Sequence, residues 1–206
     1  DRPLLSYHDH SGASVRGKLL EHLAAGKSVA YASEAGTPLI ADPGYHLSKE
    51  AAEAGHLVTS APGPSAIITA LTLAGLPTDA FFFAGFLPNA KGARRSALEV
   101  VREVPGTLVF YESPKRVAEM LKDAARVLGE GRQAVVCREL TKKFEEVRRG
   151  NLAELAEALS GQNVKGEIVV LIDRAGAEAA REEDVEAALT EALGHMSVRD
   201  AADSVA

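Results

Sequence analysis

Two tight turns rich in glycine and proline constrain the fold of this chain more than any other feature of its sequence. The first, Ser33–Pro38, reads Ser-Glu-Ala-Gly-Thr-Pro, and the second, Ala61–Pro64, reads Ala-Pro-Gly-Pro. Each turn follows a short apolar run and precedes a helical pattern, so each would lie at the carboxyl end of a strand. Strand–turn–helix units of this kind predict an α/β fold with a parallel sheet and crossover helices.

The same alternation of short apolar runs and helical patterns continues along most of the chain. We expect helices over 15–25, 45–54, 65–74, 93–103, 114–128 and 152–159. We expect strands over 27–32, 56–60, 80–84, 107–111, 134–138 and 167–172. Residues 141–149 fit either a strand or an irregular segment. The elements predict an N-terminal α/β domain over 1–78, a second α/β domain over 79–173, and the start of a small helical domain over 174–206.

Composition places the chain among ordinary globular proteins. Of its 206 residues, 46% are hydrophobic and 25% are charged, which is enough for one large domain or two small ones. No stretch approaches the roughly 20 apolar residues of a membrane helix, and no signal-peptide pattern opens the sequence. The single cysteine, Cys137, leaves no disulfide within a monomer, so we expect a reducing, cytoplasmic location. Its apolar neighbours favour a buried small side chain over a nucleophile.

Charge is distributed unevenly along the sequence. Residues 85–149 contain 14 Lys and Arg against 9 Asp and Glu, whereas the rest of the chain contains 9 against 20. A basic middle between acidic flanks fits a surface that attracts phosphate groups, but charge alone favours a solvated surface of ion pairs. The net charge of −6 therefore does not by itself exclude a nucleic-acid partner.

The two turns are the first candidates for a binding site. Glycine allows the backbone to approach a ligand closely, and Ser65 is placed to cap the helix after the second turn. Either turn alone is as well explained by chain reversal, but two in one half of a sheet favour a small-molecule cleft. Asp42–Gly44 fits a helix-entry turn, and His8–His10 fits an exposed loop because no further metal ligands accompany it, so we expect no metal.

Charged residues follow two strands expected in the second half of the chain. Tyr111–Arg116 and Arg138–Lys143 each contain Glu together with Lys and Arg, which is typical of a polar acceptor site and also of surface ion pairs. Lys91, Arg94 and Arg95 follow a loop that contains glycine, and we expect them on a mobile basic segment that closes over phosphates.

Seven strings together resemble the family of ribosomal RNA small subunit methyltransferase I, within the tetrapyrrole methylase superfamily. They occur in the family's order over about residues 4 to 173. The strings are Ser33–Pro38 with Asp42–Gly44, Pro62–Ala66, Gly75–Pro77, Gly85–Pro88, Phe110–Pro114, Arg138–Lys142 and Lys165–Glu167.

The resemblance implies two α/β domains of the tetrapyrrole methylase type, a class III methyltransferase fold, with S-adenosylmethionine bound in the cleft between them. It implies 2′-O-methylation of a cytidine in the decoding region of 16S rRNA, with free rRNA or the small ribosomal subunit as partner and a homodimeric assembly. By the same resemblance the donor contacts are Ala35, Gly36, Thr37, Pro38, Gly63, Pro64, Ser65, Ala66, Tyr111, Glu112, Gly166 and Glu167. The expected RNA contacts are Lys91, Arg94, Arg95, Lys115 and Arg116.

The chain departs from the family pattern in two respects. Glu34 stands where the family's turn usually has Asp. The family also begins with a strand and a loop of the Gly-Asn-Leu-Gly-Asp type, which this sequence does not contain. Because residue 1 is Asp and the last residues read as a helix cut off in progress, we expect a sequence truncated at both ends.

Methyl transfer to a ribose hydroxyl requires a proton acceptor and a group that stabilises the developing oxyanion. Glu112 and Glu139 are the candidate acceptors, and Arg138 and Lys142 the candidate stabilising cations, because all four follow expected strands. Two alternatives remain at this point: a porphyrinoid C-methyltransferase of the same superfamily, and an RNA-binding module without catalysis. Ser33–Pro38 argues against the first, because those enzymes tend to carry a Gly-Gly-Asp-Pro type of turn.

Overall fold

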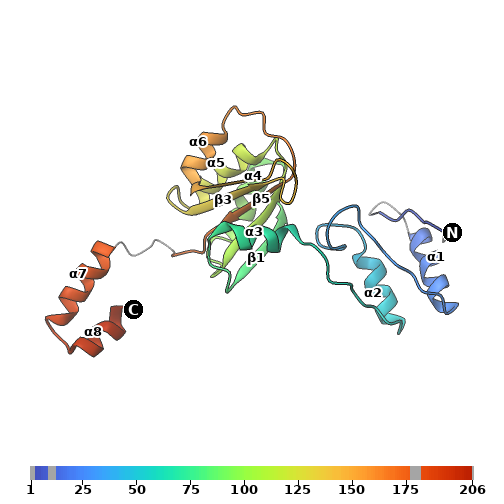
Figure 1. Ribbon diagram of the computed structural model, residues 1–206, viewed down its shortest axis with the longest axis horizontal. Coiled ribbons are helices and arrows are strands. Elements are labelled where there is room, and N and C mark those ends of the chain that lie inside the picture. Colours follow the sequence, from blue (N-terminus) through green and yellow to red (C-terminus); the bar gives the residue numbers. More distant parts are fainter. Residues whose placement is uncertain (1–2, 9–12, 177–181, 206) are drawn as a thin grey trace. The chain divides into compact units, whose positions relative to one another are not determined.

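The computed structural model describes residues 3–8, 13–176 and 182–205 (Figure 1). The chain divides into two compact units, Asp1–Thr72 and Leu73–Ala206. The helices are α1 (Ala13–Ala24), α2 (Tyr45–Glu53), α3 (Ala66–Ala74), α4 (Lys91–Val100), α5 (Val117–Leu128), α6 (Leu152–Leu159), α7 (Glu182–Leu193) and α8 (Val198–Val205). The strands are β1 (Phe81–Phe86), β2 (Thr107–Glu112), β3 (Gln133–Arg138), β4 (Glu146–Asn151) and β5 (Ile168–Ile172). The three-part division expected from the sequence stays a prediction.

The first unit contains helices joined by long irregular segments. Helices α1 and α2 contact each other, and Arg16 Nε lies 2.7 Å from Glu50 Oε1 across this contact. Leu19 and Leu47 are buried. The chain before and after α1 also meets, because the rings of Tyr7 and Tyr31 lie edge to face with centroids 5.8 Å apart.

The expectation of a parallel sheet in the first unit is wrong for the described residues. Neither 27–32 nor 56–60 forms a strand there. A strand requires a neighbour that satisfies its backbone N–H and C=O groups, and an apolar run does not specify that neighbour. Leu57 is 91% exposed, so its side chain also lacks the cover that a sheet face would provide.

The second unit contains a five-stranded mixed sheet in the order β1-β2-β5-β3-β4. Only β1 and β2 are parallel, and the other neighbouring pairs are antiparallel. Strand β5, with the sequence Ile-Val-Val-Leu-Ile, is buried throughout because it lies between two other strands and both of its faces are covered. The register of β1 against β2 shifts between Phe83 and Gly85, and Gly85 has a φ of 68°.

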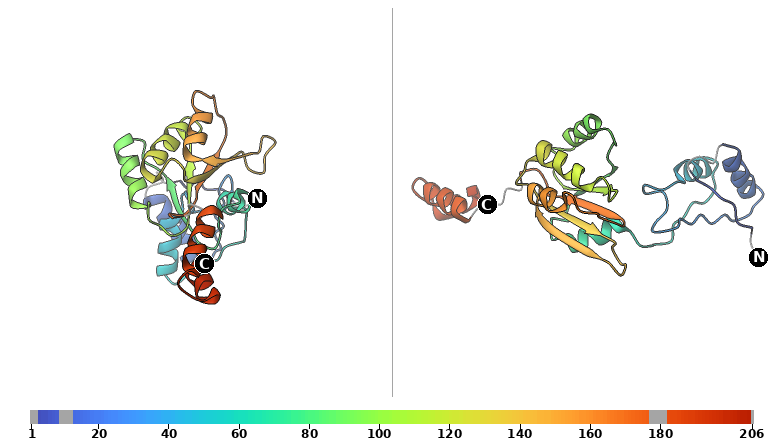
Figure 2. Two further views of the ribbon diagram at one scale, coloured as in Figure 1. Left: turned by 90° about the vertical axis from the view of Figure 1, so that its left-hand side faces the viewer. Right: turned by 90° about the horizontal axis from the view of Figure 1, so that it is seen from above.

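Helices α4, α5 and α6 lie together on one face of this sheet (Figure 2). Their apolar side chains form one core with the strands, in which Leu98, Phe110, Met120 and Leu152 are fully buried. Helix α6 begins at a capping box, since Asn151 Oδ1 accepts from Glu154 N at 2.8 Å and Glu154 Oε2 accepts from Asn151 N at 3.0 Å. The segment left open over 141–149 contains both forms: an irregular turn, then β4.

Helices α7 and α8 contact each other after the sheet has ended. No helix among residues 3–8, 13–176 and 182–205 has the length and apolar character to cross a membrane.

Candidate active site

The two glycine-rich turns of the first unit are hydrogen-bonded to each other. Thr37 donates to the carbonyl oxygen of Pro64 from both its backbone N and its Oγ1, each at 3.1 Å. Ser33 Oγ closes the first turn by donating to the Gly36 carbonyl oxygen at 2.8 Å. Gly36 has a φ of 73°, and a Cβ there would lie 3.5 Å from Pro64 O. The two turns that the sequence singles out as candidates for a binding site therefore form one local structure.

The chain after the first turn adopts unusual backbone angles. Leu39 and Ala41 have φ of 75° and 56°, in the left-handed region that side chains other than glycine rarely adopt. Gly44, with φ of 124°, precedes α2, and a Cβ there would lie 2.7 Å from Tyr31 Cε1 and 2.9 Å from Leu39 Cδ1. This close packing agrees with a structural role for Asp42–Gly44. Left-handed residues in a rigid context are typical of functional sites.

In the second unit, one row across the sheet brings the predicted strand ends together. Glu112 on β2 is paired with Ile168 on β5, Ile168 with Arg138 on β3, and Arg138 with Glu146 on β4. Because β5 runs antiparallel to both β2 and β3, its beginning lies beside their ends. Glu112, Arg138 and the Gly166–Glu167 segment therefore share one edge of the sheet.

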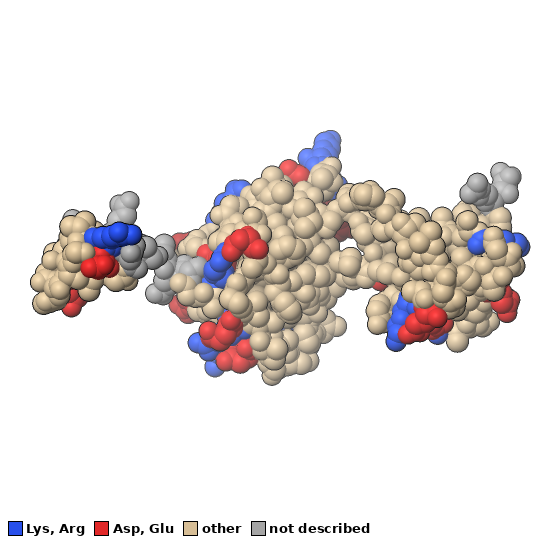
Figure 3. Space-filling model, turned by 90° about the horizontal axis from the view of Figure 1, so that it is seen from below, with Lys and Arg blue, Asp and Glu red and all other residues tan. Residues whose placement is uncertain are grey.

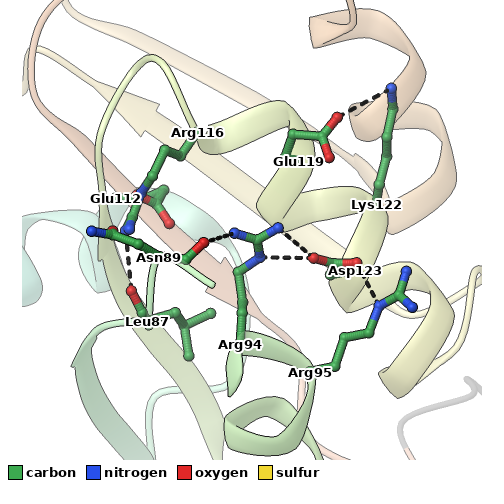
Figure 4. Close-up of polar contacts among 9 residues, drawn as sticks. All are labelled: Leu87, Asn89, Arg94, Arg95, Glu112, Arg116, Glu119, Lys122 and Asp123. Carbon is green, nitrogen blue, oxygen red and sulfur yellow. Dashed lines mark hydrogen bonds and ion pairs between the residues drawn. The ribbon is translucent and has the colours of Figure 1, made fainter. Parts of the chain in front are cut away.

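Glu112 is a buried carboxylate that holds the chain after β2 (Figure 4). Its Oε1 accepts from Ser113 N at 2.6 Å and from Arg116 Nε at 2.8 Å. Arg116 Nη2 lies 2.6 Å from the same oxygen and donates to the Leu87 carbonyl oxygen at 3.2 Å. The other oxygen, Oε2, is buried without a hydrogen-bond partner among the described residues. An unsatisfied buried acceptor of this kind fits the contact of a bound ligand.

Glu139 and Lys142 form an ion pair in the loop after β3. Lys142 Nζ lies 2.9 Å from Glu139 Oε1 and 3.0 Å from Glu167 Oε2. Glu139 Oε1 also accepts from Glu167 N at 2.9 Å. This backbone hydrogen bond, followed by the Lys142 contact, lowers the pKa of Glu139, and the two carboxylates raise the pKa of Lys142. Glu139 and Thr141 have φ of 51° and 64°. The loop after β3 therefore contains left-handed residues, as does the chain after the first glycine-rich turn.

Tyr111 lies in an aromatic group that the sequence reading did not identify. Its ring centroid is 4.9 Å from that of Phe83 and 5.6 Å from that of Phe86. Phe86 is the last residue of β1 and is 58% exposed. The signal was available, since Phe86 ends β1, Tyr111 is the next-to-last residue of β2, and parallel strands end at the same edge.

The expectations for the basic residues need correction. Lys91, Arg94 and Arg95 lie in the first turns of α4 and not on a mobile loop. Arg94 is 5% exposed, and its Nε and Nη2 lie 2.7 and 2.6 Å from Asp123 Oδ2, while Arg95 Nε lies 2.7 Å from Asp123 Oδ1 (Figure 4). The guanidinium of Arg94 is thus committed to a buried ion pair, which excludes it as a phosphate contact. Lys91 and Lys115 are exposed and stay candidates.

Asp123 is a structural residue that the sequence reading missed. Burial alone would raise its pKa, but the hydrogen bonds from Arg95 and Arg94 outweigh burial and leave the pKa lowered. Two cations with one ionised carboxylate fix α4 against α5. On the face of the molecule seen in Figure 3, charged side chains likewise form small groups of mixed sign.

Cys137 is fully buried on β3, and burial raises its pKa to about 11. Its thiol is therefore protonated at neutral pH and is no nucleophile.

Of the segment His8–His10, Asp9 and His10 lie outside the described residues. No cluster of three or more metal-ligating side chains occurs among residues 3–8, 13–176 and 182–205.

Comparisons with known proteins agree with these observations. Residues 8–156 match the family model described as Tetrapyrrole (Corrin/Porphyrin) Methylases. A ribosomal RNA small subunit methyltransferase I from Mesorhizobium japonicum is 46% identical over all 206 residues, which span 70% of that protein. The protein of the same name from Pseudomonas aeruginosa is 46% identical over 84% of this chain and 62% of its own length. The one from Escherichia coli O157:H7 is 45% identical over 89% of the chain and 64% of its length.

Solved structures show the same fold at lower sequence identity. The methyltransferase CobJ has a TM-score of 0.58 at 20% identity, over 79% of this chain and 71% of its own. A uroporphyrin-III C-methyltransferase from Thermus thermophilus, complexed with S-adenosyl homocysteine, has a TM-score of 0.51 at 18% identity, over 80% and 74%. The α/β fold of the tetrapyrrole methylase type expected from the sequence is confirmed.

Proposed function

Since the chain belongs to the tetrapyrrole methylase family, and within it to the family of ribosomal RNA small subunit methyltransferase I, we propose that it methylates the ribose 2′-oxygen of a cytidine in the decoding region of 16S rRNA. The methyl donor in this proposal is S-adenosylmethionine. The acceptor is the small ribosomal subunit or its rRNA, and the active assembly is a homodimer. The observation that carries the proposal is the sheet edge that gathers Glu112, Arg138, Glu139 and Glu167.

The residues present fit a donor that carries an ammonium group and ribose hydroxyls. Glu112 Oε2 is a buried acceptor without a partner among the described residues, and such a donor offers N–H and O–H groups. In the first unit, Gly36 and Gly63 flank the Thr37–Pro64 hydrogen bonds and leave backbone open to close approach. Each unit therefore offers a candidate donor contact of its own, Glu112 in the second unit and the paired turns in the first.

Glu139 and Lys142 suit the acceptor side of the reaction. The bound donor supplies an electrophilic methyl group. Lys142 has a raised pKa and stays charged, so it can stabilise negative charge that develops on the acceptor oxygen. Glu139 has a lowered pKa and stays ionised at neutral pH, as a proton acceptor must. Its side chain is 18% exposed, whereas that of Glu112 is fully buried, so Glu139 is the proton acceptor in this proposal and Glu112 a donor-binding residue.

The test is methyl transfer from labelled S-adenosylmethionine by the 206-residue chain to small ribosomal subunits, to 16S rRNA and to uroporphyrinogen. We expect transfer to the ribosomal acceptor, at a cytidine 2′-oxygen that mass spectrometry of nuclease digests identifies. Glu139→Gln should lower the turnover by about 10²-fold with donor affinity retained, because the proton acceptor is lost together with its ion pair to Lys142, and neither is a donor contact in this proposal. Glu112→Gln should weaken donor binding measured by calorimetry.

Glu119→Gln on α5 is the matched control, because the one ion pair of Glu119 among the described residues is a surface pair, in which Lys122 Nζ lies 3.9 Å from Glu119 Oε1. It should leave both turnover and donor affinity unchanged. Transfer to uroporphyrinogen alone would replace the proposal by a porphyrinoid methyltransferase. Donor-independent RNA binding without transfer would indicate a binding module. Full turnover in the Glu139 variant would remove its assigned role.

A further inference from the structure

A pocket of about 250 Å³ opens beside the candidate active site, on the face of the sheet that α5 and α6 cover. Val136, Leu159 and Val164 form its apolar part. Its polar rim consists of Arg138 and Glu146 at the ends of β3 and β4, Arg148 on β4, and Gln162, Asn163 and Lys165 from the segment between α6 and β5. None of the strings that carry the family resemblance contains Glu146, Arg148 or Gln162.

One carboxylate holds two guanidinium groups in this pocket. Glu146 Oε2 lies 2.9 Å from Arg138 Nε, and Glu146 Oε1 lies 2.6 Å from Arg148 Nε. The two arginines are therefore oriented through their Nε atoms, and their terminal nitrogens point elsewhere. Arg138 Nη1 reaches the Lys165 carbonyl oxygen at 3.4 Å, and Arg148 Nη1 reaches Gln162 Oε1 at 3.3 Å. No hydrogen bond from either Nη2 to a described residue is found.

The charges of the pocket do not balance. Arg138, Arg148 and Lys165 contribute three positive charges, and Glu146 contributes one negative charge. The side chains of Arg138 and Arg148 are still 26% and 33% exposed, so their remaining N–H groups reach solvent. Fixed guanidinium groups with free N–H donors and excess positive charge bind oxyanions, phosphate above all, because the planar fork matches two oxygens at once.

We propose that this pocket binds a phosphate group, and that in the methylation reaction this group is a backbone phosphodiester of the RNA close to the modified ribose. The proposal rests on the proposed function for the identity of the RNA. The position of the pocket supports it, because Arg138 directly precedes Glu139, and Lys165 directly precedes Gly166 and Glu167. A phosphate held here would fix the nucleotide chain at the same sheet edge that holds the proton acceptor and Lys142.

The test compares Arg148→Gln and Lys165→Gln with Arg126→Gln, which removes the same charge from an exposed position on α5 that lines a different groove. Binding to a 16S rRNA fragment of the decoding region is measured over a range of salt concentrations. The plot of log K against log salt has a negative slope. Each pocket variant should reduce the magnitude of that slope by about one, since one phosphate contact is lost. Arg126→Gln should leave the slope unchanged. Arg148→Lys should keep the slope but lose affinity, because it keeps the charge without the fork.

A second measurement uses inorganic phosphate and the amide resonances of Lys165 and Gly166 in the 206-residue chain. Saturable shifts that disappear in Arg148→Gln support the pocket. Unchanged RNA slopes in both pocket variants, or an equal loss in Arg126→Gln, overturn the inference while leaving methyl transfer to rRNA untouched. If the wild-type chain transfers no methyl group to rRNA, the proposed function fails, and the phosphate titration alone decides the pocket: no saturable shift overturns it. Thermal unfolding of each variant checks that the fold is retained.

Discussion

Gly166 lies directly against the carboxylate of Glu139. A Cβ at residue 166 would lie 2.5 Å from Glu139 Cδ and 2.6 Å from Oε1, closer than any real side chain permits. The absence of a side chain at residue 166 is what allows Glu139 to accept the backbone N–H of Glu167 and to bind Lys142. Two segments that are far apart in the sequence therefore depend on one glycine.

Gly166→Ala should displace Glu139 and abolish most methyl transfer. Gly166 also has a φ of 93°, so the alanine would add backbone strain of about 1–3 kcal/mol. Gly161→Ala is the matched control, because Gly161 has a φ of 72° and open space around its Cα. Both variants should lose stability in thermal unfolding, but only Gly166→Ala should lose turnover beyond that. Equal activity of the two variants would show that the Glu139 contact has no role in the reaction.

Asp123→Asn should destabilise the second unit by about 3–5 kcal/mol at neutral pH, since it leaves Arg94 buried without its counter-ion. The folded pKa of Asp123 is lowered, so the ion pair contributes its full stability above the ordinary pKa of about 3.9. That contribution is lost as the pH falls through the lower folded value. Denaturant titrations at pH 7 and pH 3 should therefore show a difference between variant and wild type that shrinks in acid.

Glu119→Gln on the same helix is the control for Asp123→Asn, because exposed ion pairs contribute only about 0–1 kcal/mol. A difference that is the same at both pH values would contradict the assignment of the ionised carboxylate.

The three central strands of the second unit, β2, β3 and β5, were predictable from the sequence because they are buried apolar runs. Strand β5 is buried at every residue, and the expected range 167–172 differs from Ile168–Ile172 by one residue. Helix α6 was expected over 152–159 and has those bounds, with the Asn151 capping box as its start signal. The runs at 27–32 and 56–60 contain a smaller share of apolar residues than β5. Nothing in their residues specifies a neighbouring strand.

Arg94 shows why the candidate site was predicted less well than the fold. The sequence around a basic residue near a glycine does not distinguish a side chain that binds phosphate from one that binds a buried carboxylate. Arg94 and Leu98 are four residues apart, so they share one face of α4, and both are buried. That spacing was the available signal. The partner, Asp123, lies 29 residues further along the chain, and sequence spacing alone does not reveal such a pair.

Cys137 should be unreactive in the folded protein. Its side chain is fully buried and its pKa is raised to about 11, so little thiolate exists at pH 8. A thiol reagent should modify it about 10²-fold more slowly than in the chain unfolded in denaturant, where one equivalent reacts quickly. Because the folded pKa is raised, its contribution to stability is complete below a pH of about 8.5, the ordinary thiol value, and is lost as the pH rises toward 11. Rapid labelling without denaturant would contradict this burial.

Thr37→Val should separate donor binding from stability in the first unit. The substitution keeps the shape of the side chain and the backbone hydrogen bond to Pro64, but it removes the hydrogen bond from Oγ1. Because this bond is exposed, its loss should cost about 0.5–1.5 kcal/mol. The turn at Ser33–Pro38 would then be held to the second turn by one hydrogen bond in place of two, so S-adenosylmethionine should bind several-fold more weakly in calorimetry. Thr72→Val removes a comparable exposed hydrogen bond, from Thr72 Oγ1 to Thr69 O at 2.8 Å, and should leave donor affinity unchanged. Equal donor affinity in both variants would mean that the pairing of the two turns serves the fold and not the donor.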